Sequence, residues 1–317
     1  MNRIELFEHP LARTPLVPLS GSYGANRLYI KRDDMIPFSF GGNKARKAAE
    51  FYREIKDSDI DVIMTYGSNS SNHCRIIANM AAAMGLSCHI ISPEENRERL
   101  YNTKLVEQFG ATIETCPVSR VSETIDRRIE AYRQEGRKPY FITGGGHGNP
   151  GTESYVKAYR EIEAWERESG ISFDYIFHAS GTGATQAGLV CGQLLFGEVN
   201  RSPARIVGIS IAREEGRGRK VVKDSIREYL GEKFDSLYRE DALLFTDQYR
   251  CGGYGNYTDE IKSLIDRVMM REGIPMDTTY VGKAFWGMLR FLQDNQIEGK
   301  RVLFIHTGGT PLYFDGL

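Results

Sequence analysis

The sequence lacks the features that mark membrane, exported and nucleic-acid-binding proteins. It contains no apolar run of the roughly 20 residues that a membrane-spanning helix needs. The N-terminal stretch MNRIELFEHPLART has no apolar core of the kind that a secretory signal carries. Neither charge is in excess, because the formal net charge is -1, so no global field would attract nucleic acid or an anionic membrane. We therefore expect no membrane and no nucleic-acid partner.

Cysteine is scarce and scattered. The five cysteines are an odd number, form no C-x-x-C pair and lie far apart, at Cys74, Cys88, Cys116, Cys191 and Cys251. This pattern argues against a disulfide framework and against a cysteine zinc site. Together with the missing signal, it favours a cytoplasmic protein, and we expect no metal centre.

Short apolar runs rich in β-branched residues alternate with longer amphipathic segments along most of the 317 residues. The apolar runs predict strands at 61–66, 87–92, 111–115, 139–143, 175–179, 205–210 and 301–306. The amphipathic segments predict helices at 72–84, 97–109, 121–134, 151–168, 184–196, 217–230, 258–272 and 281–295. Such alternation predicts an α/β fold with open, mostly parallel, twisted sheets and helices on both faces.

A glycine-rich stretch, TGGGHGNPGT at 143–152, interrupts the alternation near mid-chain. We interpret it as a crossing between two lobes, with a second crossing near residue 46. The predicted domains are a larger one, 1–46 and 144–317, and a smaller inserted α/β domain, 47–143. In open α/β sheets ligands bind at the carboxyl ends of the strands, so we expect binding loops after 61–66, 175–179 and 301–306.

The stretch FGGNKARK, at 40–47, places a lysine at the start of a predicted helix, where the helix dipole favours negative charge. In the simpler interpretation, Asn43 is an N-cap and Lys44 is a solvated side chain. In the other, Lys44 is held where its ammonium form is disfavoured. This would lower its pKa and make its amine a nucleophile for carbonyls.

The loop after 61–66 opens a helix with GSNSSNHCR, at 67–75. Its serines and asparagines are common helix caps, and alone they would indicate nothing more. The free N–H groups of a helix start can also bind a carboxylate. In that case Ser71, Asn72 and His73 would surround the bound group.

The loop after 175–179, SGTGATQAG at 180–188, favours a phosphate. Its glycines let the backbone approach an anion closely, and Thr182 and Thr185 add hydroxyl donors at a helix N-terminus. A dinucleotide fingerprint would need glycine or alanine at Gln186, and no Gly-Lys-Ser/Thr follows as in a P-loop. A single phosphate monoester therefore fits best.

The loop after 301–306, HTGGTP at 306–311, follows the last predicted strand. Alone it would be a plain turn, but the Thr307 hydroxyl could face a ring nitrogen. A reactive lysine, a phosphate site, a carboxylate site and this hydroxyl suit one ligand. Pyridoxal 5′-phosphate has one phosphate and one aldehyde and acts on amino acids. The sequence therefore predicts this cofactor, held mainly by the larger domain, and a small amino acid as substrate.

Six motifs also resemble, in order, those of the fold type II pyridoxal-phosphate enzymes, the tryptophan synthase β-like group. They are FGGNKARK, SSNHCR, GTGATQAGL, CGGYGN, YVGKAFWGM and IHTGG, and the similarity begins at RTPLVPL, 13–19. The motifs are most similar to the branch of D-cysteine desulfhydrase and 1-aminocyclopropane-1-carboxylate deaminase. This resemblance implies a two-lobed fold with the cofactor between the lobes, and a homodimer.

The resemblance implies a role for each matching residue. Lys44 matches the lysine that binds the cofactor, and Asn72 matches the residue that hydrogen-bonds to the ring oxygen. Ser71 matches a serine near the α-carbon and carboxylate of the substrate. Tyr254 and Tyr280 match two active-site tyrosines, although each alone more often marks a packed or turn residue.

The resemblance also covers the loops that would hold the phosphate and the pyridine ring. Thr307 matches the partner of the pyridine nitrogen, with Gly308 beside it. The residues that match the phosphate loop are Gly181, Thr182, Gly183, Ala184 and Thr185. Ala184 replaces a glycine that is usual in this loop.

One position departs from the pattern. After Tyr280 the deaminase usually carries glutamate and the desulfhydrase threonine, whereas Val281 can neither ionise nor hydrogen-bond through its side chain. We predict a lyase that performs β-elimination and deamination of a small, D-cysteine-like amino acid to a 2-oxo acid and ammonia. The alternatives are a 1-aminocyclopropane-1-carboxylate deaminase, a β-replacement synthase, and a non-catalytic relative that binds the cofactor or an amino acid.

Overall fold

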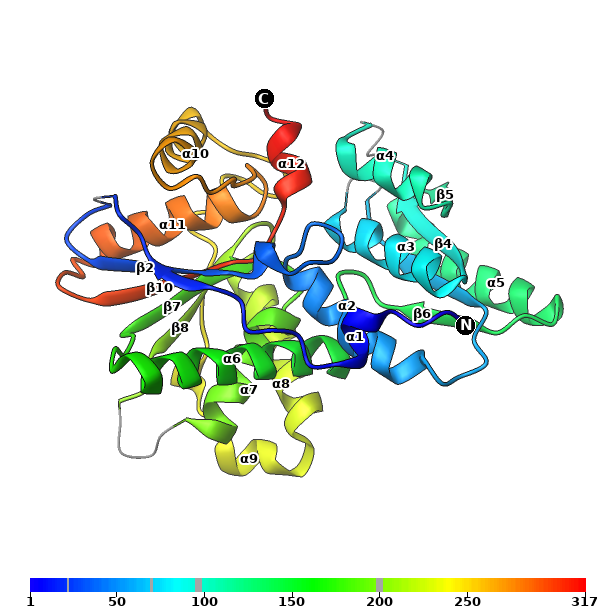
Figure 1. Ribbon diagram of the computed structural model, residues 1–317, viewed down its shortest axis with the longest axis horizontal. Coiled ribbons are helices and arrows are strands. Elements are labelled where there is room, and N and C mark those ends of the chain that lie inside the picture. The colour runs from blue at the N-terminus through cyan, green and yellow to red at the C-terminus, as the bar shows by residue number, and fades with distance from the viewer. Residues whose placement is uncertain (22, 69–70, 95–98, 198–201) are drawn as a thin grey trace.

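Strands and helices alternate along the chain and build two sheets with helices packed against them (Figure 1). The computed structural model describes residues 1–317 except 22, 69–70, 95–98 and 198–201. Within the described chain, β1 and β2 form the antiparallel pair and the other strand pairs are parallel. The predicted α/β fold with mostly parallel sheets is confirmed.

The larger sheet has six strands in the order β1-β2-β10-β7-β8-β9. Their bounds are β1 Leu16–Pro18, β2 Arg27–Arg32, β7 Tyr175–Ser180, β8 Arg205–Ser210, β9 Leu244–Thr246 and β10 Arg301–His306. Segments from both ends of the sequence meet in this sheet, because β10 pairs in parallel with β2 on one side and with β7 on the other.

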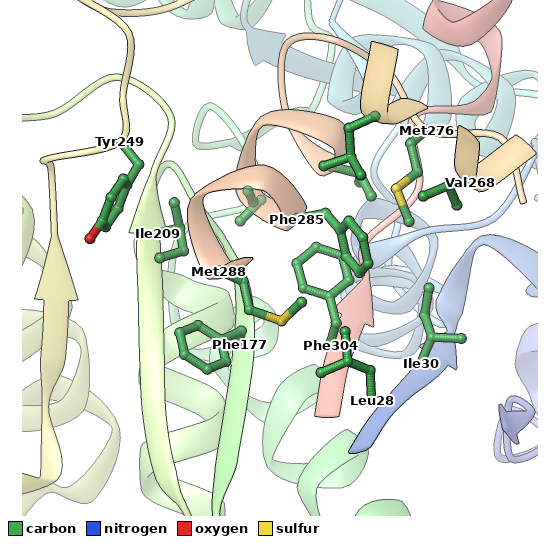
Figure 2. Packing of buried hydrophobic residues seen from close by; sticks show 14 of the residues in the cluster. Leu28, Ile30, Phe177, Ile209, Tyr249, Val268, Met276, Phe285, Met288 and Phe304 are labelled. Carbon is green, nitrogen blue, oxygen red and sulfur yellow. The ribbon is translucent and has the colours of Figure 1, made fainter. Parts of the chain in front are cut away.

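Helices cover both faces of the larger sheet because alternate strand residues point to opposite sides. In β10, Val302 and Phe304 join a core with α10 Asp259–Glu272 and α11 Val281–Asp294, part of which Figure 2 shows. Leu303 and Ile305 join the opposite core. That core contains residues of three helices, α6 Asn149–Ser169, α7 Ala184–Phe196 and α8 Glu215–Leu230.

The smaller sheet has four strands in the order β5-β4-β3-β6, all within residues 62–142, and lies to the right in Figure 1. Its strands are β3 Val62–Tyr66, β4 Ser87–Pro93, β5 Thr112–Cys116 and β6 Pro139–Ile142. The helices of this lobe are α3 Asn72–Met84, α4 Tyr101–Gln108 and α5 Val121–Gln134. Residues 97–98, where the sequence predicted the start of α4, lie outside the described chain.

Helix α2, Asn43–Ile55, runs across the predicted border between the domains. Ala45 lies before residue 46 and Ala48 after it, yet both belong to the core of the smaller lobe. Phe7 of the short helix α1, Glu5–Glu8, joins the same core. Packing therefore does not divide the chain at residue 46. The domain limits stay a prediction, with a larger domain of 1–46 and 144–317 and a smaller one of 47–143.

The remaining elements are short. They are η1 Asp33–Met35, η2 Val118–Arg120, η3 Gly231–Lys233, α9 Phe234–Leu237, η4 Glu240–Ala242 and α12 Thr310–Phe314. In the described part of the chain no helix combines the length and the apolar character needed to cross a membrane.

Candidate active site

A cavity of about 600 Å³ is lined by residues of both lobes at the carboxyl ends of the parallel strands. The loops after β3, β7 and β10 contribute Ser71, Thr182 and Thr307 respectively. These are the three loops at which the sequence predicted binding. The predicted site residues that line the cavity are Lys44, Ser71, Asn72, His73, Gly181, Thr182, Gly183, Thr185, Tyr254, Tyr280, Thr307 and Gly308.

Lys44 lies in the first turn of α2, and its side chain reaches the cavity. The helix begins at Asn43 with Gly42 as its N-cap, so Asn43 does not cap the helix. The Lys44 Nζ donates to the carbonyl oxygen of Gly145 at 2.9 Å. Burial lowers the pKa of Lys44 from 10.5 to about 8, as the sequence predicted for an amine in a site that disfavours its charged form.

Lys47 provides a second buried amine next to Lys44. Its Nζ donates to the same carbonyl oxygen, Gly145 O, at 3.1 Å. Burial, followed by the charge of Lys44, lowers the pKa of Lys47 well below the ordinary lysine value. Gly145 also packs on the phosphate loop, because a Cβ on Gly145 would meet the Thr182 side chain at 2.5 Å. The two amines therefore lie beside the predicted phosphate site.

A buried network of charges fixes α2 in place. Arg46 donates through Nε and Nη2 to both carboxylate oxygens of Asp33 at 2.8 Å, and through Nη1 to Glu161 at 2.6 Å. Lys31 donates to Glu161 at 2.5 Å, and the Tyr155 hydroxyl donates to Asp33 at 2.8 Å. Burial alone would raise the pKa of Asp33, but Arg46 and Lys31 lower it below its usual range. The network ties the helix of Lys44 to β2 and α6.

Two glycines bring the last loop against the start of α2. Gly42 has φ of 93° and Gly308 has φ of 102°, a region that favours glycine. A Cβ on Gly42 would lie 2.9 Å from the Cα of Gly308, and the Asn43 N–H donates to Thr307 O at 2.9 Å. Any side chain at either glycine would separate the two backbones, which hold Thr307 and Lys44 in the same cavity.

The phosphate loop ends at the N-terminus of α7, with Gly183 at φ 101°. The Thr185 Oγ1 accepts a hydrogen bond from Asn43 Nδ2 at 3.2 Å, so its own proton can be donated to a ligand. The side chain of Ala184 is fully buried and does not line the cavity. Ala184 can therefore contribute only its backbone N–H to a bound phosphate.

Arg213 adds a cation to the same wall of the cavity. It follows β8, lines the cavity and donates through Nη1 to the carbonyl oxygen of Gly181. Burial lowers the pKa of Arg213, yet a guanidinium keeps its charge at physiological pH. Among the described cavity residues there is no aspartate or glutamate. The cavity therefore favours a ligand with anionic groups.

The N-terminus of α3 forms the opposite wall. Ser71 is its N-cap and accepts hydrogen bonds from the N–H groups of His73 and Cys74. Asn72 accepts a hydrogen bond from Asn102 Nδ2 at 2.9 Å, which leaves the amide N–H₂ of Asn72 to donate to a ligand oxygen.

The ring of His73 is held in one tautomer. The Thr65 hydroxyl donates to Ile142 O at 2.7 Å, so it accepts from His73 Nε2 at 2.8 Å. Burial, followed by the charges of Lys44 and Lys47, lowers the pKa of His73 well below 6.5. His73 is therefore a neutral ring with a proton on Nε2.

Two tyrosines close the cavity on the side of the larger lobe. The hydroxyls of Tyr254 and Tyr280 lie 2.6 Å apart and share a hydrogen bond. Burial raises the pKa of both phenols, so both stay protonated near neutral pH. Ser68 of the smaller lobe hydrogen-bonds to Tyr254. Asp277 accepts from the Tyr280 N–H at 2.6 Å and fixes the backbone at the start of α11.

Val281 lies outside the cavity wall. Its side chain is fully buried in the core between the larger sheet, α10 and α11. Its N–H donates to Asp277 at 3.2 Å. A carboxylate at this position would enter an apolar core beside the buried Asp277, so valine is the residue that this packing accommodates.

Sequence reasoning missed several residues of this site. Lys47 follows Lys44 by three positions on the same helix, and that spacing could have identified it, because residues so spaced share a helix face. Gly145 lies in the glycine-rich stretch 143–152, which the sequence analysis interpreted only as a crossing between lobes, and Arg213 comes from a loop whose sequence gives no such signal. In the described chain no group of three or more His, Cys, Asp or Glu side chains is arranged to hold a metal ion.

The residues present fit the predicted cofactor. Thr185, the N-terminus of α7 and Arg213 offer donors and positive charge to a phosphate. Lys44 offers an amine of lowered pKa to an aldehyde. The Asn72 amide and the Thr307 hydroxyl line the remaining wall and can hydrogen-bond to a ring. A volume of about 600 Å³ falls in the range of cofactor and ligand pockets.

Comparisons with known proteins agree with this geometry. A family model described as "Pyridoxal-phosphate dependent enzyme" matches residues 8–308. A protein of Pyrococcus horikoshii, provisionally named 1-aminocyclopropane-1-carboxylate deaminase, is 33% identical over 97% of this chain and 91% of its own. A D-cysteine desulfhydrase of Klebsiella pneumoniae is 30% identical over 98% of this chain and 95% of its own.

Solved structures share the fold. The crystal structure of an ACC deaminase homologue, at 33% identity, gives a TM-score of 0.85 and covers 99% of this chain and 95% of that one. The structure of an O-ureido-L-serine synthase, at 17% identity, gives a TM-score of 0.68 and covers 97% and 92%. The second likeness shows the fold alone.

Proposed function

Because this chain belongs to the pyridoxal-phosphate dependent enzymes and uses pyridoxal phosphate, we propose that it is a lyase acting on small amino acids. The proposed reaction is β-elimination from a D-cysteine-like substrate, with release of a 2-oxo acid and ammonia. The main support is the set of groups in the cavity that can transfer a proton. They are the buried amine of Lys44 and the protonated pair Tyr254 and Tyr280, and no carboxylate lines the described cavity.

The cofactor, when bound, supplies an electron sink for the negative charge that develops at the α-carbon of the substrate. Lys44 is the proposed base that removes the α-proton. A pKa of about 8 suits this role, because an amine that titrates near the working pH can both accept and return a proton.

The proposed acid is the tyrosine pair. Because burial raises the pKa of Tyr254 and of Tyr280, each phenol keeps its proton and can donate it to a departing thiolate. The β-substituent leaves with the electron pair of its bond to carbon and takes up this proton. Water then converts the released enamine into the 2-oxo acid and ammonia.

The substrate carboxylate would bind at the N-terminus of α3. Ser71, Asn72 and His73 line this end of the cavity, and the helix N-terminus carries partial positive charge. The neutral ring of His73 adds no cation, so this helix end is the proposed source of attraction for the carboxylate. Thr307 offers the cofactor ring a neutral hydroxyl in place of a charged group.

A second candidate is opening of 1-aminocyclopropane-1-carboxylate. The Pyrococcus horikoshii relative and its name favour it. Ring opening has no good leaving group and needs added help from a nucleophile or an acid–base group beside the ring carbons. Val281, at the position where the deaminase pattern has glutamate, packs in the core, and no aspartate or glutamate lines the described cavity, which favours elimination.

An assay of 2-oxo acid release by the purified protein separates these functions. The substrates are D-cysteine, β-chloro-D-alanine, their L-enantiomers and 1-aminocyclopropane-1-carboxylate, and Lys44→Ala is the inactive control. We expect pyruvate from the D-amino acids and little from the cyclopropane. Ring opening as fast as elimination would favour the deaminase, and no release from any elimination substrate would favour a β-replacement synthase.

Homodimer formation and a cytoplasmic location are part of the same proposal. All five cysteines are free thiols in the structure, and four of them are buried, which supports a reducing compartment. Sedimentation of the purified protein would test the dimer, and a single species with the mass of one chain, 35.8 kDa, would contradict it.

A further inference from the structure

The loop that carries Tyr254 has a strained backbone. Cys251 has φ of 54°, which residues with a side chain rarely adopt, and Gly252 and Gly253 follow with φ of 82° and 141°. A non-glycine residue in this region is retained only where the surrounding structure fixes it. Contacts from outside the loop must therefore hold residues 251–253.

Lys283 makes those contacts. Its side chain is fully buried on α11, and its Nζ donates to Gly253 O at 2.8 Å and to Arg250 O at 3.2 Å. The two carbonyls lie on either side of the strained Cys251. A third contact, to Ile211 O at 3.4 Å, joins the same amine to the residue that follows β8 and lines the cavity.

The contacts of Lys283 are made to backbone carbonyls. The described chain places no carboxylate within ion-pair distance of its amine, and its neighbours Ala284 and Phe285 are part of an apolar core. A buried amine needs acceptors in place of water, and the three carbonyl oxygens match its three N–H donors. The site is thus built to join three backbone segments through one side chain.

The joined segments meet at the tyrosine pair. Gly253 directly precedes Tyr254, and Lys283 lies one turn after Tyr280 on α11. We propose that Lys283 is a positioning residue, which holds the Tyr254 hydroxyl against that of Tyr280 and so sets the geometry of the proton donor. This inference rests on the proposed elimination, in which the pair protonates the leaving group.

A double-mutant cycle tests the proposal. Lys283→Met keeps the length of the side chain and removes its donors. It should lower kcat/KM for the best elimination substrate about 10- to 100-fold, the scale on which displacement of a reacting group slows catalysis. The affinity for pyridoxal phosphate should not change, because no contact of Lys283 reaches the phosphate loop.

In the Tyr254→Phe background, Lys283→Met should add little further loss, because the hydroxyl that it positions is already absent. Met288→Ala is the control: Met288 lies buried in the apolar core on the same helix, and its replacement should have equal effects in both backgrounds. Equal losses from Lys283→Met in both backgrounds would overturn the proposal.

Lys283→Ala gives a second route if the methionine variant does not fold. Methylammonium should restore part of its rate, whereas tetramethylammonium, which has no N–H, should not. Amide hydrogen exchange at 250–255 should be faster in either variant, and unchanged exchange would overturn the proposal. This measurement needs no turnover, so it remains decisive even if the wild-type protein eliminates nothing and the proposed function fails.

Discussion

Replacing Thr185 by valine removes the hydroxyl that would donate to the phosphate, together with the hydrogen bond that this hydroxyl accepts from Asn43. The side chain is buried, and valine has nearly the same volume. Because Thr185 Oγ1 already accepts from Asn43 Nδ2, its own proton is the one available to the phosphate. A hydrogen bond to a charged group contributes about 1.5–3 kcal/mol. The dissociation constant of pyridoxal phosphate should therefore rise about 10- to 150-fold, at about 1.4 kcal/mol per decade.

The assay is a titration of the cofactor-free protein with pyridoxal phosphate, followed by absorbance. Thr152→Val is the matched control, because Thr152 is a buried threonine of the same lobe whose hydroxyl donates to the carbonyl oxygen of Gly148, the N-cap of α6. It does not line the cavity. Unchanged affinity in Thr185→Val, or an equal loss in Thr152→Val, would refute the assignment of the phosphate to this loop.

Two further predictions concern α2. Arg46→Met removes the guanidinium that Asp33 and Glu161 share, while Lys31 stays beside both carboxylates, and it should lower the free energy of unfolding by about 3–5 kcal/mol in urea denaturation. Arg53→Met, which removes a partly exposed pair with Glu50 on the same helix, should cost about 1 kcal/mol or less, and equal losses would contradict the network's role. Capture of pyridoxal phosphate by the cofactor-free protein should accelerate as pH rises through about 8, because the reactive free amine of Lys44 forms there. A midpoint near the ordinary lysine value of 10.5 would contradict the buried position of Lys44.

The sequence predicts the helices and strands whose apolar residues follow a simple period. Helix 72–84 and strand 205–210 have the predicted bounds. Strand β2, Arg27–Arg32, was not predicted, because its charged residues obscure the alternation. Lys31 is buried there only because Glu161 and Asp33, which are distant in sequence, surround its amine. A partner supplied by the tertiary fold leaves no local signal.

The residues of the site also divide into those that a local sequence signal predicts and those that depend on the tertiary fold. Lys44, Ser71 and Thr185 were predicted because a helix start marks each of them in the sequence. Val281 was singled out because the resembling enzymes carry glutamate or threonine there, but the structure buries its side chain in the core, a direction that sequence position alone does not give. Lys283 belongs to a recognised motif, yet its role depends on three carbonyls from separate loops. Contacts to backbone atoms have no sequence signature.

The central claim is that Lys44 binds the cofactor. Reduction of the purified protein with borohydride, digestion and mass mapping test it directly, because the buried amine of Lys47 lies beside it as a built-in competitor. The account predicts a yellow protein whose label maps to Lys44, persists in Lys47→Met and is lost in Lys44→Met. A label on Lys47, or a colourless protein that takes up no pyridoxal phosphate, would contradict it.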